Sequence, residues 1–487
     1  MNKKTKIVAT LGLVSDKKDT LRKMFDAGMN VGRLNFSHGS YEWHGNIIKA
    51  LRELSEEVGQ PIGILADLQG PRIRTVVESD VEIKTGDIVL VGDISEKSKL
   101  QITNYKLQKK SELKIQNDKK FLLDVLNIVD DIEVGNEILI EDGIIKVVVK
   151  EKDGGVLLCE VVDGGIVKNH KGVNIPDAQL HIDPVTEKDE RDLEFALQND
   201  VDFVALSFVS NGADIENLRN RMKKILRRED SLPQIIAKIE RKEAIKNLDE
   251  IIEHTDAVMV ARGDLGIEIE TSKVAVLQKE IIKKCLENMK PVIVATQMLN
   301  SMIENPRPTR AEVSDVTNAV IDHADAVMLS GESASGKYPI ESVQIMAQII
   351  QNTEASPFDD VTHMLKLNGE SDFKALVKGA YELSRNSSAK AIVLASVSGF
   401  TARLMSHFRP EQPLFVVTNN QKTYQQLALV WGANVYYTGK IELFQAIEDM
   451  ISGVKKEGGI NDGDSVIIVL GSVPGGERMQ LVGVKKI

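Results

Sequence analysis

Apolar residues gather in short runs along the first part of the chain, and each run ends in polar residues. Near-continuous apolar runs of this length are typical of buried parallel strands. Amphipathic stretches follow them; residues 43–59, for example, have helical apolar spacing and end at Gly59, a residue suited to close a helix. The runs occupy residues 7–12, 30–36, 62–68, 203–208, 235–240, 257–264, 291–297 and 325–332. Eight such strands alternating with helices predict a closed (β/α)8 TIM barrel, whose site lies at the carboxyl ends of the strands.

One link between these predicted strands is far longer than the others. Between Asp67 and Phe203 the chain alternates apolar and polar residues, with Gly and Asp at the turns, a pattern typical of antiparallel hairpins. We therefore predict an inserted small β-barrel domain at residues 75–171, with the catalytic barrel formed by residues 1–74 and 172–345. A domain placed over the open face of a barrel can act as a lid.

A second α/β series follows the barrel. The stretch NTEASPFDD, with its proline and acids, indicates a linker after a helix near residues 338–351. The runs KAIVLAS, PLFVVTNN, ANVYYTG and DSVIIVLGS then alternate with helical stretches. Residues 346–487 are therefore predicted to form a separate, doubly wound α/β domain.

Composition excludes several classes of protein. The chain has 487 residues, of which 42% are hydrophobic and 27% charged, and no run approaches the ~20 apolar residues of a membrane span. Its start, MNKKTKIVATLG, lacks the apolar stretch of a signal peptide. The only cysteines, Cys159 and Cys285, are too few for a disulfide framework, which favours a reducing cytoplasm. A formal net charge of −11 argues against general binding of nucleic acid.

Alternation along the predicted strands places polar side chains together at their ends. Residues two apart in a strand share a face, so Lys238 and Glu240 project together from the fifth strand. Further polar side chains at or just beyond strand ends are Arg33, Asn35, Ser37, Asp67, Arg72, Arg74, Asp264, Thr296 and Ser330. We expect the closed barrel to bring these ends together, although any one of them alone is more often a cap or a surface ion pair.

Together these residue types indicate phosphoryl transfer. Glu240 and Asp264 are hard oxygen donors suited to Mg²⁺ or Mn²⁺. Lys238, Arg33 and Arg74 are cations suited to a transferring phosphoryl group. Positioning and neutralisation of charge are what phosphoryl transfer requires of a protein.

Four long segments resemble the pyruvate kinase family over essentially the whole chain. They are MNVGRLNFSHG, AKIERKEAIKNLDEII, VMVARGDLGIEI and KPVIVATQMLNSMIENPRPTRAEVSDVTNAVIDHADAVMLSGESASGKYP. The resemblance implies transfer of the phosphoryl group of phosphoenolpyruvate to ADP, giving pyruvate and ATP in glycolysis. It also implies a C-terminal regulatory domain and a homotetramer.

The resemblance assigns roles residue by residue. It implies that Glu240 and Asp264 bind the divalent metal, that Lys238 stabilises the phosphoryl group and the developing enolate, and that Thr296 lies near the proton-delivery path. The implied substrate-binding residues are Arg33, Lys238, Gly263, Asp264, Thr296, Ser207 and Ser330. The implied nucleotide-binding residues are Arg74, His38 and Lys171. Arg262 is left as a structural residue.

One departure from the family concerns potassium. Many members read DTKGPEIR where this chain reads DLQGPRIR, so that Arg72 replaces a glutamate of the potassium site. The matching site residues are Asn35, Ser37, Asp67 and the carbonyl of Leu68. A guanidinium there could supply the positive charge of K⁺ and would repel a second cation. The hypothesis is an enzyme that does not require K⁺, with Arg72 acting in its place.

The last domain contains a candidate phosphate site in SVSGFTAR, residues 396–403. Its small and hydroxyl residues before a helix fit an anion site or an ordinary helix cap equally well. The resemblance favours an effector phosphate bound by Ser396, Ser398, Gly399 and Thr401. Val397 stands where some members carry a lysine for a sugar bisphosphate, which points to a monophosphate such as AMP or a sugar phosphate.

Two other functions compete with this interpretation. A metal-dependent lyase or aldolase acting on pyruvate enolate could use a similar barrel, but it would not need the lid or the cations Arg33, Arg74 and Lys238. A non-catalytic paralogue acting as a regulator would have no chemical reason to keep Lys238, Glu240, Asp264 and Thr296 together.

Overall fold

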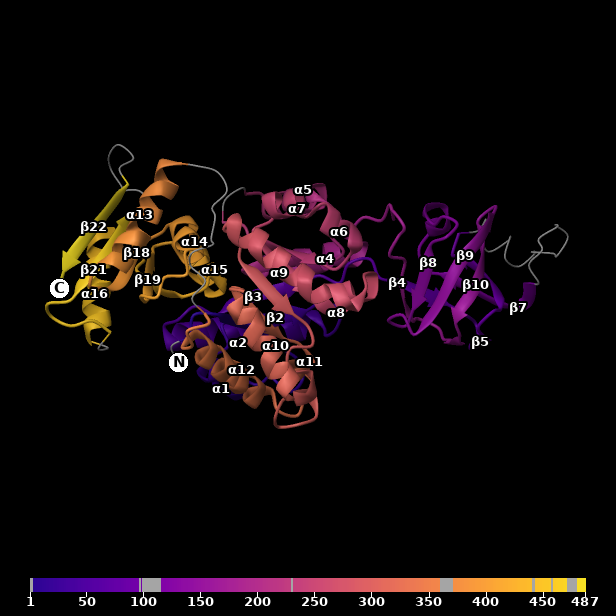
Figure 1. Ribbon diagram of the computed structural model, residues 1–487, viewed down its shortest axis with the longest axis horizontal. Helices are drawn as coiled ribbons and strands as arrows, with labels where there is room; N and C mark the ends of the chain where they lie inside the picture. Colours follow the sequence, from indigo (N-terminus) through magenta and orange to yellow (C-terminus); the bar gives the residue numbers. More distant parts are fainter. Residues whose placement is uncertain are drawn as a thin grey trace.

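The computed structural model describes residues 3–95, 98, 115–228, 231–359, 371–439, 443–456, 459–470 and 480–487. Figure 1 shows three units in a row, with a barrel wrapped in helices between a small β barrel and a C-terminal α/β sheet. The ends of two predicted segments, Asp360 and residues 471–472, lie outside the described residues.

The central unit is a closed barrel of eight parallel strands, as predicted. The strands follow the order β1-β17-β16-β15-β14-β13-β3-β2 around the barrel. They are β1 (Lys6–Thr10), β2 (Val31–Asn35), β3 (Gly63–Asp67), β13 (Phe203–Leu206), β14 (Gln234–Ile239), β15 (Ala257–Ala261), β16 (Val292–Ala295) and β17 (Ala326–Leu329). Because every pair is parallel, all carboxyl ends meet at one mouth of the barrel.

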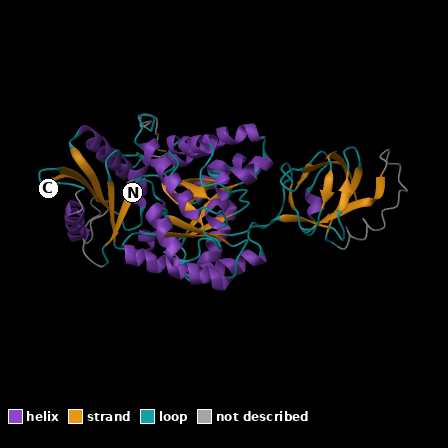
Figure 2. Ribbon diagram, turned by 90° about the horizontal axis from the view of Figure 1, so that it is seen from below, coloured by secondary structure: helices purple, strands orange, loops and turns teal. Residues whose placement is uncertain are grey.

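Helices, purple in Figure 2, cover the outside of this barrel. Several begin with side-chain caps; Thr186 and Asp189 form a capping box at the start of α4, and Asn211 and Asp214 form one at α5. The covering helices include α1 (Lys18–Ala27), α2 (Tyr41–Val58), α4 (Glu187–Gln198), α5 (Gly212–Leu226), α7 (Leu248–His254), α9 (Thr271–Glu287), α10 (Arg310–Ile321) and α12 (Pro339–Glu354). Shorter helices, α6 (Lys242–Lys246), α8 (Arg262–Glu268) and α11 (Gly331–Ala334), follow the ends of β14, β15 and β17.

The interior of the barrel is a packed core rather than a pore. Side chains from the strands fill it, including Leu65, Phe203 and Met259, and each is at most 1% exposed. Two residues of the same cluster, Ala428 and Leu429, come from the C-terminal domain. The C-terminal domain thus closes the floor of the barrel, at the end opposite the mouth.

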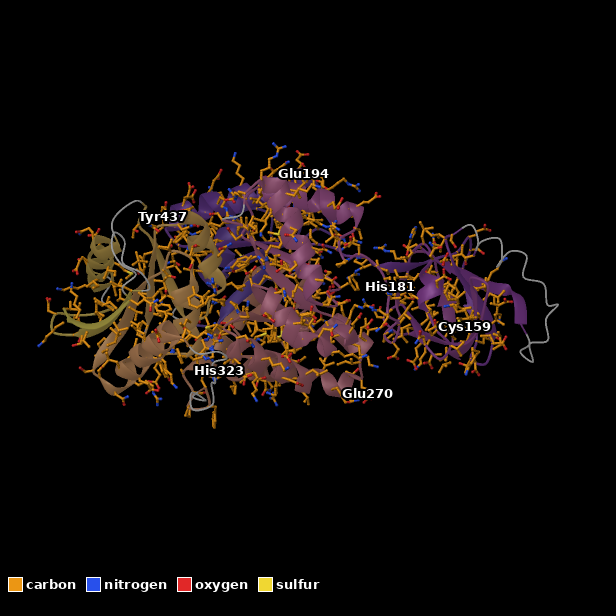
Figure 3. The ribbon with its side chains drawn as sticks, turned by 90° about the horizontal axis from the view of Figure 1, so that it is seen from above. Cys159, His181, Glu194, Glu270, His323 and Tyr437 are labelled. Atoms are coloured by element: carbon orange, nitrogen blue, oxygen red, sulfur yellow. The ribbon has the colours of Figure 1, made fainter. Side chains whose placement is uncertain are left out.

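The inserted domain is a separate closed β barrel, which we call the lid barrel. Its strand order is β10-β6-β7-β4-β12-β8-β9, and a two-stranded sheet of β11 and β5 accompanies it. The strands are β4 (Ile73–Val76), β5 (Val81–Ile83), β6 (Ile88–Asp93), β7 (Ile115–Leu123), β8 (Glu137–Ile140), β9 (Ile145–Asp153), β10 (Val156–Asp163), β11 (Gly165–Val167) and β12 (Gly172–Asn174). Cys159 is buried inside this lid barrel, and His181 lies between it and the central barrel (Figure 3).

The C-terminal unit is a five-stranded sheet in the order β20-β19-β18-β21-β22. The four predicted runs form β18 (Ala389–Ala395), β19 (Leu414–Thr418), β20 (Ala433–Tyr437) and β21 (Ser465–Leu470), whose pairs are parallel. Helices α13 (Asp372–Asn386) and α14 (Phe400–His407) pack on one face, and α16 (Leu443–Lys456) packs on the other. The antiparallel edge strand β22 (Leu481–Lys486) was not predicted.

The elements run across the boundaries proposed from the sequence. Helix α12 continues through residue 346 and packs against α1 and α10 of the barrel. Strand β12 begins at residue 172 yet belongs to the lid barrel. Among the described residues, no helix is both long and apolar enough to cross a membrane.

Candidate active site

Buried charges at the ends of β2, β3 and β14 form the centre of the site. Asp67, at the end of β3, is 1% exposed and receives the Arg33 guanidinium at 2.6 Å (Nη2 to Oδ2). Arg33 Nη1 also donates to the hydroxyl of Thr10 at 2.8 Å. Removing either member of a buried pair leaves an unpaired charge, which costs about 3–5 kcal/mol. The Arg33 guanidinium is therefore held in one orientation at the mouth.

Lys238 lies among oxygen atoms from three neighbouring strands. Its ammonium is 2.8 Å from Glu240 Oε1 and 3.3 Å from Asp67 Oδ1. It also donates to the hydroxyl of Ser207 at 2.7 Å, and that hydroxyl donates to the carbonyl of Leu68 at 2.8 Å. The position of the amine is thus fixed by β3, β13 and β14 together.

The two carboxylates keep Lys238 charged. Burial alone would lower the pKa of Lys238, but Asp67 and Glu240 raise it above its ordinary value. Burial likewise would raise the pKa of Asp67, yet Lys238 and Arg33 lower it overall. Because both shifts favour the charged forms, the cluster contains an ammonium and a carboxylate at neutral pH.

Glu240 and Asp264 form the candidate metal site. Burial raises the pKa of Glu240, and the negative charge of Asp264 raises it further against the opposing effect of Lys238. Glu240 and Asp264 repel each other, and a bound divalent cation would offset this repulsion. Their carboxylate oxygens are hard donors, so the residues fit Mg²⁺ or Mn²⁺. Within the described part of the chain, no group of three or more His, Cys, Asp or Glu side chains forms a complete metal cage. A bound ion would need oxygen ligands from water or substrate as well.

Thr296 and Gly263 meet beside Asp264. The Gly263 amide, in the first turn of α8, donates to the Thr296 hydroxyl at 2.8 Å. Thr296 has a φ of 68°, an uncommon conformation for a threonine. Arg262 holds this backbone, because its Nη2 donates to the Thr296 carbonyl at 2.7 Å while Nη1 pairs with Asp315 at 2.8 Å.

The candidate nucleotide residues lie apart from this cluster. Arg74 is on β4 of the lid barrel, and its register partner Gly172 directly follows Lys171. The Lys171 amine pairs with Glu141 at 2.5 Å, within the lid barrel. His38 is exposed after β2, with its carbonyl 2.9 Å from the ring Nε2 of His44.

Three of the four candidate potassium donors, Asn35, Asp67 and the Leu68 carbonyl, have partners among the described residues. Asn35 Oδ1 accepts the Ser37 amide at 3.1 Å, and the Leu68 carbonyl accepts the Ser207 hydroxyl. Asp67 is engaged by Arg33 and Lys238, as described above. Arg72 is exposed and lines a groove with Asp264, Arg241 and Glu268, at the base of the lid barrel.

The candidate effector residues surround the start of α14. Gly399 caps this helix with a φ of 78°, and no side chain caps it. Ser396 and Thr401 are buried, whereas Ser398 is exposed. The carbonyl of Val397 accepts the hydroxyl of Thr423 at 2.8 Å. This loop is thereby attached to α15 (Gln421–Gln426).

Three residues that fix the loops and side chains at the mouth of the barrel were not predicted from the sequence. Thr10 binds Arg33, and Lys188 donates to the Phe36 carbonyl at 2.6 Å. Glu332 is 1% exposed and accepts the amides of Ser330 and Leu299 at 2.7 and 3.0 Å. Thr10 and Glu332 lie at the ends of recognised strand runs, so their position was a usable signal. Lys188 lies at the start of α4 and gave none.

Comparison with known proteins gives one consistent match. The family models described as "Pyruvate kinase, barrel domain" and "Pyruvate kinase, alpha/beta domain" match residues 2–343 and 374–480. The pyruvate kinase of Geobacillus stearothermophilus is 41% identical over 488 residues, which cover 98% of this chain and 79% of that protein. A pyruvate kinase of Staphylococcus epidermidis is 41% identical over 483 residues, with the same two coverages.

The fold gives the same match. The crystal structure of a pyruvate kinase from Cryptosporidium parvum aligns with a TM-score of 0.89 and 32% identity, covering 100% of this chain and 96% of that one. Because the match includes the barrel, the lid barrel and the C-terminal domain, it decides against the lyase alternative.

Proposed function

Because the chain belongs to the pyruvate kinase family, we propose that the mouth of its barrel transfers a phosphoryl group with Lys238 at the centre. The chain is a phosphotransferase: phosphoenolpyruvate and ADP are its substrates, and pyruvate and ATP are its products. The observation that carries the residue assignment is the buried ammonium of Lys238, held between Asp67, Glu240 and Ser207.

Lys238 acts as a fixed positive charge. The phosphoryl group in transfer and the enolate left behind both carry negative charge, which a preorganised ammonium stabilises without reorganisation of solvent. Arg33, locked against Asp67 and Thr10, adds a second cation that contacts the phosphate. Asp67 and Ser207 position these cations rather than react.

Glu240 and Asp264 are the residues that would hold Mg²⁺ or Mn²⁺. Such an ion, when bound, neutralises charge on the phosphoryl oxygens. The backbone amides of Gly263 and Asp264 are proposed to bind the carboxylate of phosphoenolpyruvate, and Ser330 is a further substrate contact. The Thr296 hydroxyl, kept beside Gly263 at 2.8 Å, is proposed to stand on the path by which the enolate gains its proton.

The lid barrel supplies the nucleotide contacts in this proposal. Arg74 lies on β4 of the lid barrel, opposite the residue that follows Lys171, and His38 lies exposed on the loop after β2. Contacts between described residues of the lid barrel side and the central barrel include Asn174 Nδ2, which donates to Glu268 Oε1 at 3.1 Å, and Lys242, which pairs with Asp177 at 2.5 Å. Movement about this junction would bring the nucleotide residues toward the mouth.

The enzyme is proposed to work without K⁺. Support comes from Arg72, whose guanidinium lines the groove that contains Asp264, and from the protein partners of Asn35 and Leu68.

We further propose a cytoplasmic homotetramer, and an effector monophosphate bound by Ser396, Ser398, Gly399 and Thr401. The first turn of α14, which no side chain caps, supports the effector site, because its backbone amides can donate hydrogen bonds to an anion.

The test is formation of pyruvate from phosphoenolpyruvate and ADP with Mg²⁺, in paired buffers that contain K⁺ or only a bulky organic cation. We expect equal turnover in both buffers. Turnover only with K⁺ would keep the activity and contradict the role of Arg72. No turnover in either buffer, with Mn²⁺ and phosphate effectors also tried, would favour the non-catalytic paralogue.

A further inference from the structure

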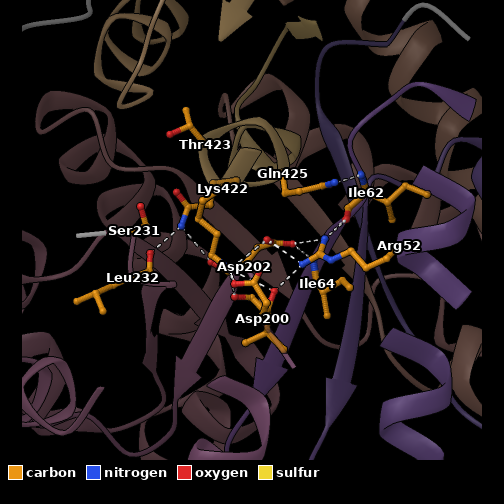
Figure 4. Close-up of polar contacts among 12 residues, drawn as sticks. Arg52, Ile62, Ile64, Asp200, Asp202, Ser231, Leu232, Lys422, Thr423 and Gln425 are labelled. Atoms are coloured by element: carbon orange, nitrogen blue, oxygen red, sulfur yellow. Dashed lines mark hydrogen bonds and ion pairs between the residues drawn. The ribbon is translucent and has the colours of Figure 1, made fainter. Parts of the chain in front are cut away.

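A buried lysine of the C-terminal domain reaches the floor of the barrel. Lys422, on α15, is 8% exposed. Its ammonium donates to the Val201 carbonyl at 2.5 Å and to Asp200 Oδ1 at 2.8 Å, and lies 3.5 Å from Asp202 Oδ1. Figure 4 shows the lysine entering this network from above, with Asp200 and Asp202 beneath it. Lys422 of the C-terminal domain therefore holds the segment that leads into β13.

Asp202 is the point where this segment joins the neighbouring strand. Its side chain is fully buried, and its Oδ2 accepts the Ile64 amide of β3 at 2.8 Å. Arg52 pairs with both carboxylate oxygens, at 3.0 and 2.9 Å. The Asp202 backbone also bonds to Ile64 and Gln234, so it links β3, β13 and β14 at their amino ends.

The same three strands hold Lys238 at their other ends. Strand β13 has only four residues, and Ser207 follows it directly. Strand β3 ends at Asp67, and β14 carries Lys238 itself. Short strands in a closed barrel are stiff, so a shift at the floor moves the groups at the mouth. Misplacement of a catalytic group by 1 Å can lower a rate about 100-fold.

We propose that Lys422 is a positioning residue for the reaction: through Asp202 and β13 it fixes the Ser207 hydroxyl that holds the Lys238 amine. This inference rests on the role proposed for Lys238. The C-terminal domain then contributes to turnover directly, and not only as a place where an effector binds. Thr423, next in sequence, donates to the Val397 carbonyl of the candidate effector loop, so α15 contacts both the floor of the barrel and that loop.

The experiment compares four purified full-length variants with the wild type. Lys422→Met removes the contact, and Lys422→Arg keeps its charge. Lys4→Met is the matched control, since Lys4 also joins the domains, by donating to the Pro410 carbonyl at 3.1 Å and lying over Trp431 at 5.1 Å, without touching β3 or β13. Lys238→Met tests the catalytic role itself. For each variant, kcat, both KM values and the melting temperature are measured.

We expect Lys422→Met to lower kcat about tenfold with little change in either KM, because the loss falls on the transition state. Lys422→Arg should recover most of kcat, and Lys4→Met should lower the melting temperature alone. Wild-type kcat in Lys422→Met beside an inactive Lys238→Met would overturn this inference and leave the proposed function intact. Normal turnover in Lys238→Met would instead overturn the proposed function. If Lys422→Met is insoluble, Lys422→Gln replaces it with the same expectations.

Discussion

Arg72 differs from the other cations at the mouth of the barrel in what surrounds it. Arg33 and Lys238 are largely buried and paired with carboxylates, whereas the Arg72 side chain is exposed and, within the described ranges, forms no hydrogen bond or ion pair. No described residue of the protein therefore neutralises the charge of Arg72. A guanidinium keeps its charge at any relevant pH, so it can replace a bound cation permanently.

The first prediction concerns this charge. In Arg72→Glu, the local charge is reversed, so we expect turnover without K⁺ to fall about tenfold or more and to be restored at least partly by K⁺. Arg72→Gln is the control that removes charge without adding an acid, and it should show a smaller loss. The measurement is kcat as a function of KCl at constant ionic strength. Equal turnover of Arg72→Glu with and without K⁺ would contradict the idea.

Alternation along single strands was enough to predict that several polar side chains lie together at the mouth of the barrel. Because side chains two apart share a face, Lys238 and Glu240 could be expected to act together, and the structure places them 2.8 Å apart. The pairing of Arg33 with Asp67 was not predicted, since both were read as groups for ligands. It depends on β2 and β3 being neighbours in register, with Asn35 opposite Asp67.

At the level of elements, the first turn of α4 connects two loops of the mouth. Lys188 donates to the carbonyl of Phe36 in the loop after β2. Asp189, fully buried, accepts the amide of Gly70 at 3.2 Å in the loop after β3 and also belongs to the capping box of α4. One helix end thus fixes the loop after β2, which carries Ser37, and the loop that leads from β3 to the lid barrel.

The second prediction follows from this double role. Asp189→Ala removes a capping partner and the acceptor of Gly70, so we expect the free energy of unfolding to fall by about 1–2 kcal/mol and kcat to fall as well. The control is Asp214→Ala, which removes the equivalent capping residue of α5. It should lower stability similarly without changing kcat. Urea unfolding and steady-state kinetics measure both, and equal kinetic effects in the two variants would refute the special role of α4.

Contacts between elements far apart in the chain set the limit of prediction at this scale. The near-continuous apolar runs give all eight strands of the central barrel because each run is a local pattern. No pattern in the sequence predicts the contact between Lys422 and Asp202. A lysine on a short helix is ordinarily exposed to solvent. Strand β22 was missed because LVGVKK is a half-exposed edge strand with little apolar character.

At the scale of the whole molecule, the C-terminal domain is joined to the barrel by buried polar groups. Arg409 is 4% exposed, pairs with Asp325 at 3.0 Å and donates to the His323 carbonyl at 2.7 Å. His407 is buried at the same interface. Burial, and to a smaller extent Arg409, lowers the pKa of His407 to about 4. The histidine is therefore neutral in the folded protein at pH 5 and above.

The third prediction is a pH dependence of stability. An unfolded histidine has a pKa of about 6.5, so between that value and about 4 only the unfolded state binds the proton. The contribution of His407 to stability is thus complete above the unfolded pKa, and it is lost as pH falls, by about 1.4 kcal/mol per pH unit within this window.

In His407→Leu, the melting temperature should therefore fall less between pH 7 and pH 5 than in the wild type. The control is His181→Gln, since the His181 side chain is 83% exposed. Thermal unfolding at both pH values measures the difference. Parallel curves for His407→Leu and the wild type would show that this histidine is not the group involved.

The floor of the barrel has a consequence for how the protein is made. Ala428 and Leu429 complete the inner core formed by strands that begin at residue 6 and end at residue 329. While the ribosome is still translating the C-terminal domain, every side chain of the candidate active site already exists, but the barrel that arranges them has an open end. The barrel is therefore completed late, because its interior closes only after residue 429 has left the ribosome.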